Sequence, residues 1–232
     1  MTKVIDQYLG VLRGAMGPQV FKNKSGKSYA AKLPHLPLVP PSADTLKRRN
    51  RFKLTLKMAK RMHDIPQLKY FWKNYVIEDE SGKLSASNKM VKSIYPRMTY
   101  AGPMDTIRIV PDKGFEVATT SITLTNSLFT VVLQPIGVTS ILNPAVDVNV
   151  CLVCVAHLSG PENPDDRANV FFSLVSESST LSLTNPMTIE MEVDDYNKQI
   201  YDDYTNHKVF FALVTTDAND VPANFSNTFP SS

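Results

Sequence analysis

The chain has 232 residues and a mass of 25.9 kDa, enough for one large domain or two small ones. Hydrophobic residues make up 43% and charged residues 20%, which excludes wholesale disorder, a collagen-like or coiled-coil fibre and a disulfide-stapled miniprotein. No apolar run approaches the ~20 residues that cross a bilayer, and charged residues interrupt the apolar positions of segment 1–17. We therefore expect no secretory signal, no transmembrane segment, and a cytoplasmic or virion location.

Charge is divided between the two halves of the chain. Residues 1–97 hold 20 Lys and Arg against 6 Asp and Glu, whereas residues 98–232 hold 5 against 16. The balances are +14 and −11, so the overall charge of +3 conceals an electrostatic dipole. Such a dipole favours association with other copies of the chain or with a polyanion.

Residues 1–41 are predicted to form an N-terminal arm with a hairpin and a proline-rich linker. Val20 and Phe21 precede turn residues 23–26, and Tyr29 follows them, a pattern typical of a short hairpin. Four prolines in the next stretch predict an extended, semi-rigid segment. We expect this segment to contact other chains in an assembly, through Leu33, Pro34, Leu36, Pro37, Leu38, Pro40 and Pro41. Because termini stay disordered unless something holds them, we expect the C-terminal segment 225–232 also to pack on neighbouring chains.

Residues 42–97 are predicted to form a basic helical region. Ser42 or Asp44 can cap a helix that runs to His63. Its apolar spacing predicts a buried face of Phe52, Leu56, Ala59 and His63. A second helix begins at Pro66 and carries an apolar stripe of Leu68, Phe71, Trp72 and Tyr75, and a third is expected from Ser87 to Ile94.

The other side of the first helix is a candidate interface. Its cations are Lys47, Arg48, Arg51, Lys53, Lys57, Lys60 and Arg61. Three interpretations stay open: contacts with nucleic-acid phosphates, docking on the acidic half of a neighbouring subunit, or a solvated face without a partner.

Residues 98–232 are predicted to form an antiparallel, immunoglobulin-like β-sandwich. Alternating patterns predict seven strands, at residues 106–110, 121–125, 128–134, 146–156, 169–175, 187–193 and 208–214. Ile189, Met191 and Val193 alternate with acidic residues, which predicts one buried and one solvated face. The strand at 146–156 is apolar on both sides and should be covered on each face. The fold class expected for the whole chain is therefore α+β.

We expect no metal, no cofactor and no catalytic site. Cys151 and Cys154 form a C-x-x-C, but it lies in a predicted strand, where residues three apart point to opposite faces. The sequence from Ser25 to Ser28 ends like a phosphate-binding loop but lacks the loop's first glycine. The acidic doublets 165–166, 194–195 and 202–203 lack calcium-loop spacing and are interpreted as solvated loops.

Four stretches resemble a family of uncharacterised proteins common in Bacteroidetes genomes and their phages or phage-derived elements. The matching residues are Gly14 and Gly17 in the opening, Arg51-Phe52 in the helix, Ala86-Ser87-Asn88 in the middle and Ser226-Asn227-Thr228 at the end. The resemblance implies a hairpin, a linker, a basic helix and a β-sandwich in this order, and it implies no activity. Combined with the charge division, it leads us to expect a non-enzymatic, self-assembling subunit of a phage virion, with a nucleic-acid-binding or packaging-associated protein as the alternative.

Overall fold

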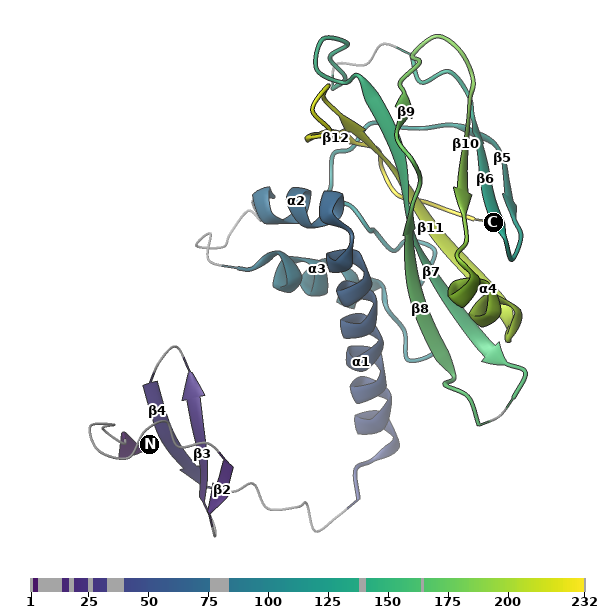
Figure 1. Cartoon of the computed structure of the whole chain (residues 1–232). Coiled ribbons are helices and arrows are strands. Elements are labelled where there is room, and N and C mark those ends of the chain that lie inside the picture. Colours follow the sequence, from purple (N-terminus) through teal and green to yellow (C-terminus); the bar gives the residue numbers. More distant parts are fainter. Residues whose placement is uncertain are drawn as a thin grey trace. The chain divides into compact units, whose positions relative to one another are not determined.

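The computed structural model describes residues 2–3, 14–16, 19–24, 27–32, 40–75, 84–137, 141–163 and 165–231 (Figure 1). The chain divides into two compact units, residues 1–45 and residues 46–232. None of the described helices is long and apolar enough to cross a membrane.

The first unit contains a four-stranded antiparallel sheet with the order β1-β4-β3-β2. Its strands are β1 (Thr2–Lys3), β2 (Gly14–Met16), β3 (Gln19–Lys24) and β4 (Lys27–Lys32). β3 and β4 pair in register from Gln19 opposite Lys32 to Lys24 opposite Lys27. The predicted hairpin is therefore confirmed.

The second unit has a six-stranded sheet between two covering layers (Figure 1). The central sheet consists of β12 (Pro222–Phe225), β11 (Tyr204–Thr216), β7 (Asn149–Pro161) and β8 (Asn169–Val175), with β9 (Ser179–Thr180) beside β7 and β13 (Phe229–Pro230) beside β11. One face carries α1 (Ala43–Asp64), α2 (Pro66–Asn74), α3 (Ala86–Ile94) and the 3-10 turn η1 (Tyr95–Arg97). The other face carries a sheet of β10 (Met187–Glu192), β6 (Leu128–Leu133) and β5 (Thr119–Leu124), together with α4 (Asp195–Asp202). The expected α+β class is confirmed.

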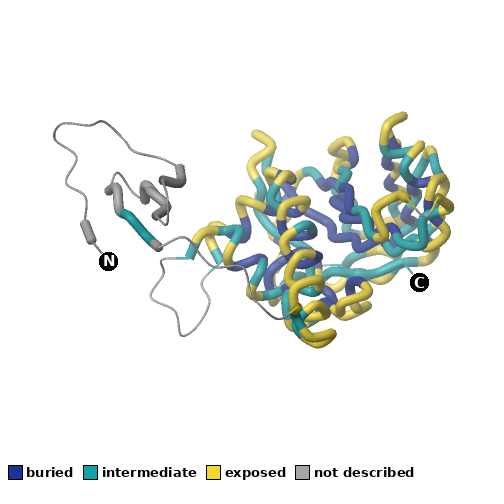
Figure 2. Tube along the Cα trace, turned by 90° about the horizontal axis from the view of Figure 1, so that it is seen from below, coloured by how far each residue is buried: buried dark blue, intermediate teal, exposed yellow. Residues whose placement is uncertain are grey.

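Strands β7 and β11 supply both cores because their side chains alternate between the two covering layers. Val153 and Val155 pack toward the helices, and Leu152 and Cys154 pack toward the outer sheet. Figure 2 shows this buried interior as dark blue segments between exposed outer elements. The prediction of a strand covered on both faces is confirmed, although β7 begins at Asn149 and its predecessors Val146 and Val148 are exposed.

The buried face of α1 differs from the predicted one. Leu54, Met58 and Met62 are buried, whereas Phe52 and Leu56 are 48% and 45% exposed. Two apolar stripes run along this helix, and spacing alone does not tell which stripe packs. The sheet decides, because the stripe of Leu54, Met58 and Met62 meets Val153 and Val155 in the helix-side core. The prediction for Phe52 and Leu56 was wrong, and only Ala59 of that set is in the core.

Two serine caps and one buried lysine satisfy backbone groups at the helix ends. The hydroxyl of Ser42 accepts from Thr45 N at the start of α1, and that of Ser85 accepts from Asn88 N at the start of α3. Lys89 is 7% exposed, and its ammonium donates to the carbonyls of Lys73 and Tyr75 at the end of α2. Lys89 therefore supplies hydrogen-bond donors to carbonyls that the end of a helix leaves unpaired.

The expected strand at 106–110 is absent from the described structure, although Ile107, Ile109 and Val110 are buried. Side chains form hydrogen bonds with its backbone groups instead. Trp72 Nε1 donates to Ile109 O at 2.9 Å, and Ile109 N donates to Thr228 Oγ1 at 3.0 Å. The segment is therefore an irregular, buried connection rather than a strand.

The C-terminal segment packs on its own chain, contrary to the expectation that it packs on neighbours. β12 and β13 both pair with β11. The buried hydroxyl of Ser226 accepts from Leu213 N at 2.8 Å, and the amide of Asn224 donates to both carboxylate oxygens of buried Asp147. Short edge strands of this kind carry no strong alternating pattern, which is why the sequence did not predict them.

Candidate functional site

Three of the seven candidate cations of α1 donate hydrogen bonds within the molecule. Lys57 Nζ donates to Asn169 O at 3.0 Å, and Arg61 Nε donates to Phe171 O at 2.9 Å. Arg51 donates twice to Tyr95 O and lies 4.3 Å from the centroid of the Tyr95 ring. These contacts hold the helix in place, so Arg51 and Arg61 are structural rather than free.

Lys57 and Arg61 lie against β8, which is an edge strand of the central sheet. An edge strand presents unpaired carbonyls that invite another strand to pair. The carbonyl oxygens of Asn169 and Phe171 accept hydrogen bonds from these two cations. Part of the basic character of α1 therefore protects a sheet edge.

The other four candidate cations, Lys47, Arg48, Lys53 and Lys60, are exposed. No ion pair joins a described cation of α1 to a carboxylate of residues 98–231; Arg61 pairs with Asp64 on the helix itself. The spacing did not single out Arg49, which is also exposed.

Two hollows adjoin along this side of α1 and share Asn50 and Lys53. The first, of about 480 Å³, is lined by Lys47, Arg49 and Tyr100 as well. The second, of about 390 Å³, extends to Lys57, Arg167 and Asn169. Burial, and then the charges of Lys53 and Arg167, hold the pKa of Lys57 below its ordinary value. We call the two hollows together the basic groove.

The arm residues fall mostly beyond what is described. Leu33, Pro34, Leu36, Pro37 and Leu38 lie outside the described residues, whereas Pro40 is exposed and Pro41 is half-buried.

Some of the carboxylates lie on the opposite layer of the second unit. Glu190 and Glu192 point outward from β10, while Ile189, Met191 and Val193 are buried, as their alternation predicted. Asp195 is exposed on α4, next to Tyr196, which is 71% exposed. We call Glu190, Glu192 and Asp195 the acidic face. Asp194 and Asp202 were expected in solvated loops, but Asp194 caps α4 through Asn197 N and Asp202 lies in its last turn.

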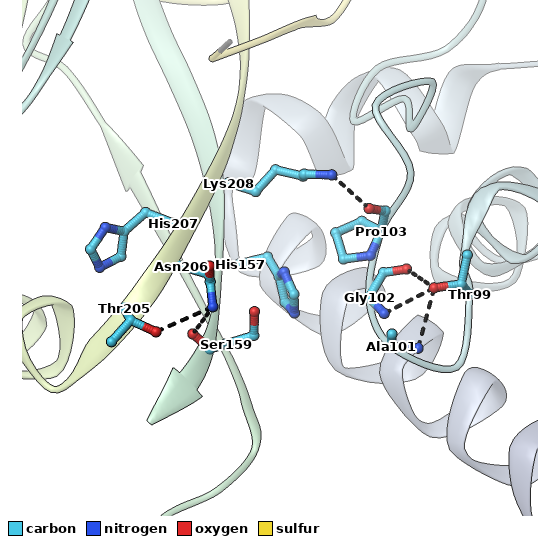
Figure 3. Close-up of a pocket in the computed structure, with 10 residues that line it drawn as sticks. All are labelled: Thr99, Ala101, Gly102, Pro103, His157, Ser159, Thr205, Asn206, His207 and Lys208. Carbon is cyan, nitrogen blue, oxygen red and sulfur yellow. Dashed lines mark hydrogen bonds between the residues drawn. The ribbon is translucent and has the colours of Figure 1, made fainter. Parts of the chain in front are cut away.

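A separate cleft of about 670 Å³ lies between the end of the central sheet and the loop before residue 104 (Figure 3). Figure 3 shows His157 and His207 on opposite sides of the sheet, since His157 is opposite Lys208 and His207 is opposite Leu158 in the strand register. His157 Nε2 donates to Asn169 Oδ1 at 2.7 Å, and His207 stacks on Tyr201. The cleft residues include no carboxylate, so this pocket pairs neither histidine with an acid.

The two cysteines occupy different cores, as their spacing predicted. Cys151 contributes to the helix-side core and Cys154 to the outer core, where its thiol lies 3.6 Å from the sulfur of Met191. Burial raises the pKa of Cys151 to about 11 and that of Cys154 to about 12. No group of three or more His, Cys, Asp or Glu residues in the described ranges could hold a metal ion.

Comparisons with known proteins identify no family. No family model and no curated protein matches the chain. A solved structure of the β-glucosidase from Kluyveromyces marxianus in complex with glucose aligns with a TM-score of 0.21 and 13% identity. The alignment covers 66% of this chain and 18% of the β-glucosidase chain, and so low a score carries no argument about fold or function.

Proposed function

We propose that this chain is a non-enzymatic structural subunit that self-assembles into a larger particle or filament, such as a phage virion. The observation that carries the proposal is the separation of charge between two layers. Exposed cations lie on α1, and the acidic face lies on β10 and α4, across the central sheet. Opposite faces that form no ion pair with each other among the described residues can meet between molecules and set their orientation.

The strand order supports an immunoglobulin-like sandwich within this proposal. The outer sheet has the order β5-β6-β10, and the central sheet has the order β8-β7-β11-β12. In chain order this matches strands A, B and E facing strands C′, C, F and G of immunoglobulin-like domains. Such sandwiches serve many functions, so the architecture is compatible with a structural subunit without identifying one.

The resemblance to the Bacteroidetes family belongs to the same proposal. Its short motifs coincide with structural contacts: Arg51 donates to the carbonyl of Tyr95, Ala86-Ser87-Asn88 form the first turn of α3, and Ser226 accepts from Leu213 N of β11. Residues with these roles are needed to build this fold, which is consistent with a shared architecture.

Sedimentation velocity and negative-stain imaging test the assembly. At an ionic strength of about 20 mM we expect species larger than a monomer, and at about 500 mM we expect dissociation, because the screening length shrinks several-fold. The variants Glu190→Lys and Glu192→Lys should weaken association. Glu177→Lys is the matched control, because that exposed residue follows β8 and lies outside the acidic face. A wild-type chain that is monomeric at every ionic strength overturns the proposal.

Nucleic-acid binding or packaging is the second candidate function. The specific observation in its favour is that the exposed residues Lys47, Arg49 and Lys53 line the same shallow hollow. Phosphate contacts release counterions, so log affinity should fall steeply with log salt concentration in a filter-binding titration. Absent or salt-independent binding removes this candidate.

A further inference from the structure

The basic groove has a row of cations at regular spacing. Arg49, Lys53 and Lys57 are four residues apart, so they follow one side of α1 over about 12 Å. Arg167, from the loop between β7 and β8, faces the same hollow as Lys57. A linear row of this kind suits an extended polyanion better than a single small ion.

These cations have no acidic partner in the described chain. Lys57 donates to a carbonyl, and no ion pair is formed by Arg49, Lys53 or Arg167 with any described carboxylate. Like charges brought together in a hollow repel one another, and an anion bound among them would relieve that repulsion.

An exposed aromatic ring stands at one end of the groove. Tyr100 is 55% exposed and lines the first hollow. Its backbone is fixed, because Asn50 Nδ2 donates to Tyr100 O at 2.7 Å and Thr99 Oγ1 accepts from Ala101 N and Gly102 N. Lys47 Nζ lies over one face of the ring, 5.5 Å from its centre, so a base would have to stack on the opposite face.

We propose that the basic groove binds single-stranded nucleic acid, with phosphates along Arg49, Lys53, Lys57 and Arg167 and a base stacked on Tyr100. A cationic track beside an aromatic platform is the arrangement that single-strand-binding proteins use. Paired bases in a duplex are already stacked on one another, so Tyr100 gives a reason for preferring single strands. The inference rests on the second candidate function and specifies its site and its substrate.

Fluorescence anisotropy with the full chain and a labelled oligothymidylate of about 15 nucleotides tests the groove. We expect tighter binding to this strand than to a duplex of the same length. Lys53→Gln and Arg167→Gln should each reduce the magnitude of the salt slope by about 0.7, the contribution of one phosphate contact on a single strand. Lys69→Gln removes the same charge from an exposed position of α2 outside the groove, and it should leave the slope unchanged.

Stacking is tested separately from charge. Tyr100→Ala should weaken single-strand binding about 5- to 100-fold without changing the salt slope, and Tyr100→Phe should retain the affinity. Tyr196→Ala, at an exposed tyrosine on α4, is the control and should have no effect. Circular dichroism of each variant checks that folding is intact.

Two results overturn the inference in different ways. If wild type binds single strands but the groove variants behave like Lys69→Gln and Tyr196→Ala, the groove is not the site, although nucleic-acid binding stands. If wild type binds neither single strands nor duplexes, the inference and the second candidate function both fail. Sedimentation of the same wild-type sample decides self-assembly independently.

Discussion

His157 shows how one side chain connects the layers of the second unit. It lies on β7 and is 5% exposed, with its ring 4.8 Å from that of Phe171. Gly102 approaches so closely that an added Cβ would lie 2.6 Å from the His157 ring, at a positive φ of 156°. Any larger residue at position 102 would therefore displace either the loop or the histidine.

The burial of His157 predicts a stability that depends on pH. Burial lowers its pKa from the ordinary 6.5 despite the hydrogen bond to Asn169, and Lys208 and Lys57 face it from β11 and α1. As the pH falls, the unfolded chain therefore binds a proton at His157 before the folded chain does. The contribution of His157 is complete above about pH 6.5 and is lost as the pH falls below that value.

Urea unfolding of wild type and His157→Gln between pH 7.5 and 5.5 measures this effect. The wild-type free energy of unfolding should fall more steeply toward low pH than that of the variant, which keeps an amide able to bond Asn169. Equal slopes for wild type and His157→Gln would contradict the prediction.

At the scale of elements, α1 is anchored along the edge strand β8. Arg61 donates to Phe171 O, and its side chain is 44% exposed. Arg61→Met keeps the apolar stem but removes the donor, which leaves the edge carbonyl without its charged partner. We expect a loss of about 1 kcal/mol in the free energy of unfolding, at the low end for bonds to charged groups because the site is partly solvated.

Equilibrium urea unfolding compares Arg61→Met with Lys60→Met. Lys60 is adjacent in the helix and exposed, so its replacement should change stability by less than about 0.5 kcal/mol. If both variants are equally stable, the contact between α1 and β8 contributes nothing measurable and the edge is protected in another way.

The elements also show where sequence patterns are ambiguous. The alternation from Ile189 to Val193 predicted the faces of β10 correctly, because a strand with one wet face has a strict period of two. For α1, two apolar stripes satisfied the helical period equally well. Only the tertiary structure selects the stripe of Leu54, Met58 and Met62, which is buried in the same core as Val153 and Val155.

At the scale of the whole molecule, both cores depend on β7 and β11. Residues of these two strands appear in the helix-side core and in the outer core. Neither covering layer can separate without exposing one face of a largely apolar strand pair. We therefore expect the unit of residues 46–232 to unfold in one cooperative transition.

The cysteines and the single tryptophan make this cooperativity measurable. Cys151 reports on the helix-side core and Cys154 on the outer core, so the variants Cys154→Ala and Cys151→Ala each leave one probe. Within each variant, thiol labelling and the fluorescence of buried Trp72 should give the same urea midpoint. Labelling of Cys151 well before Cys154 would show that the helical layer opens alone.

The sequence by itself determined the α+β class, the central buried strand, the opposite orientation of the two cysteines and the division of charge. Each depends on local periodicity or on simple counting, which tertiary contacts do not alter. The structure alone decided which stripe of α1 is buried, that residues 106–110 form no strand, and that short strands close the C-terminus onto β11. It also brought Tyr100 and Arg167 beside the cations of α1. These features join residues from distant parts of the chain, and spacing along one segment carries no record of such contacts.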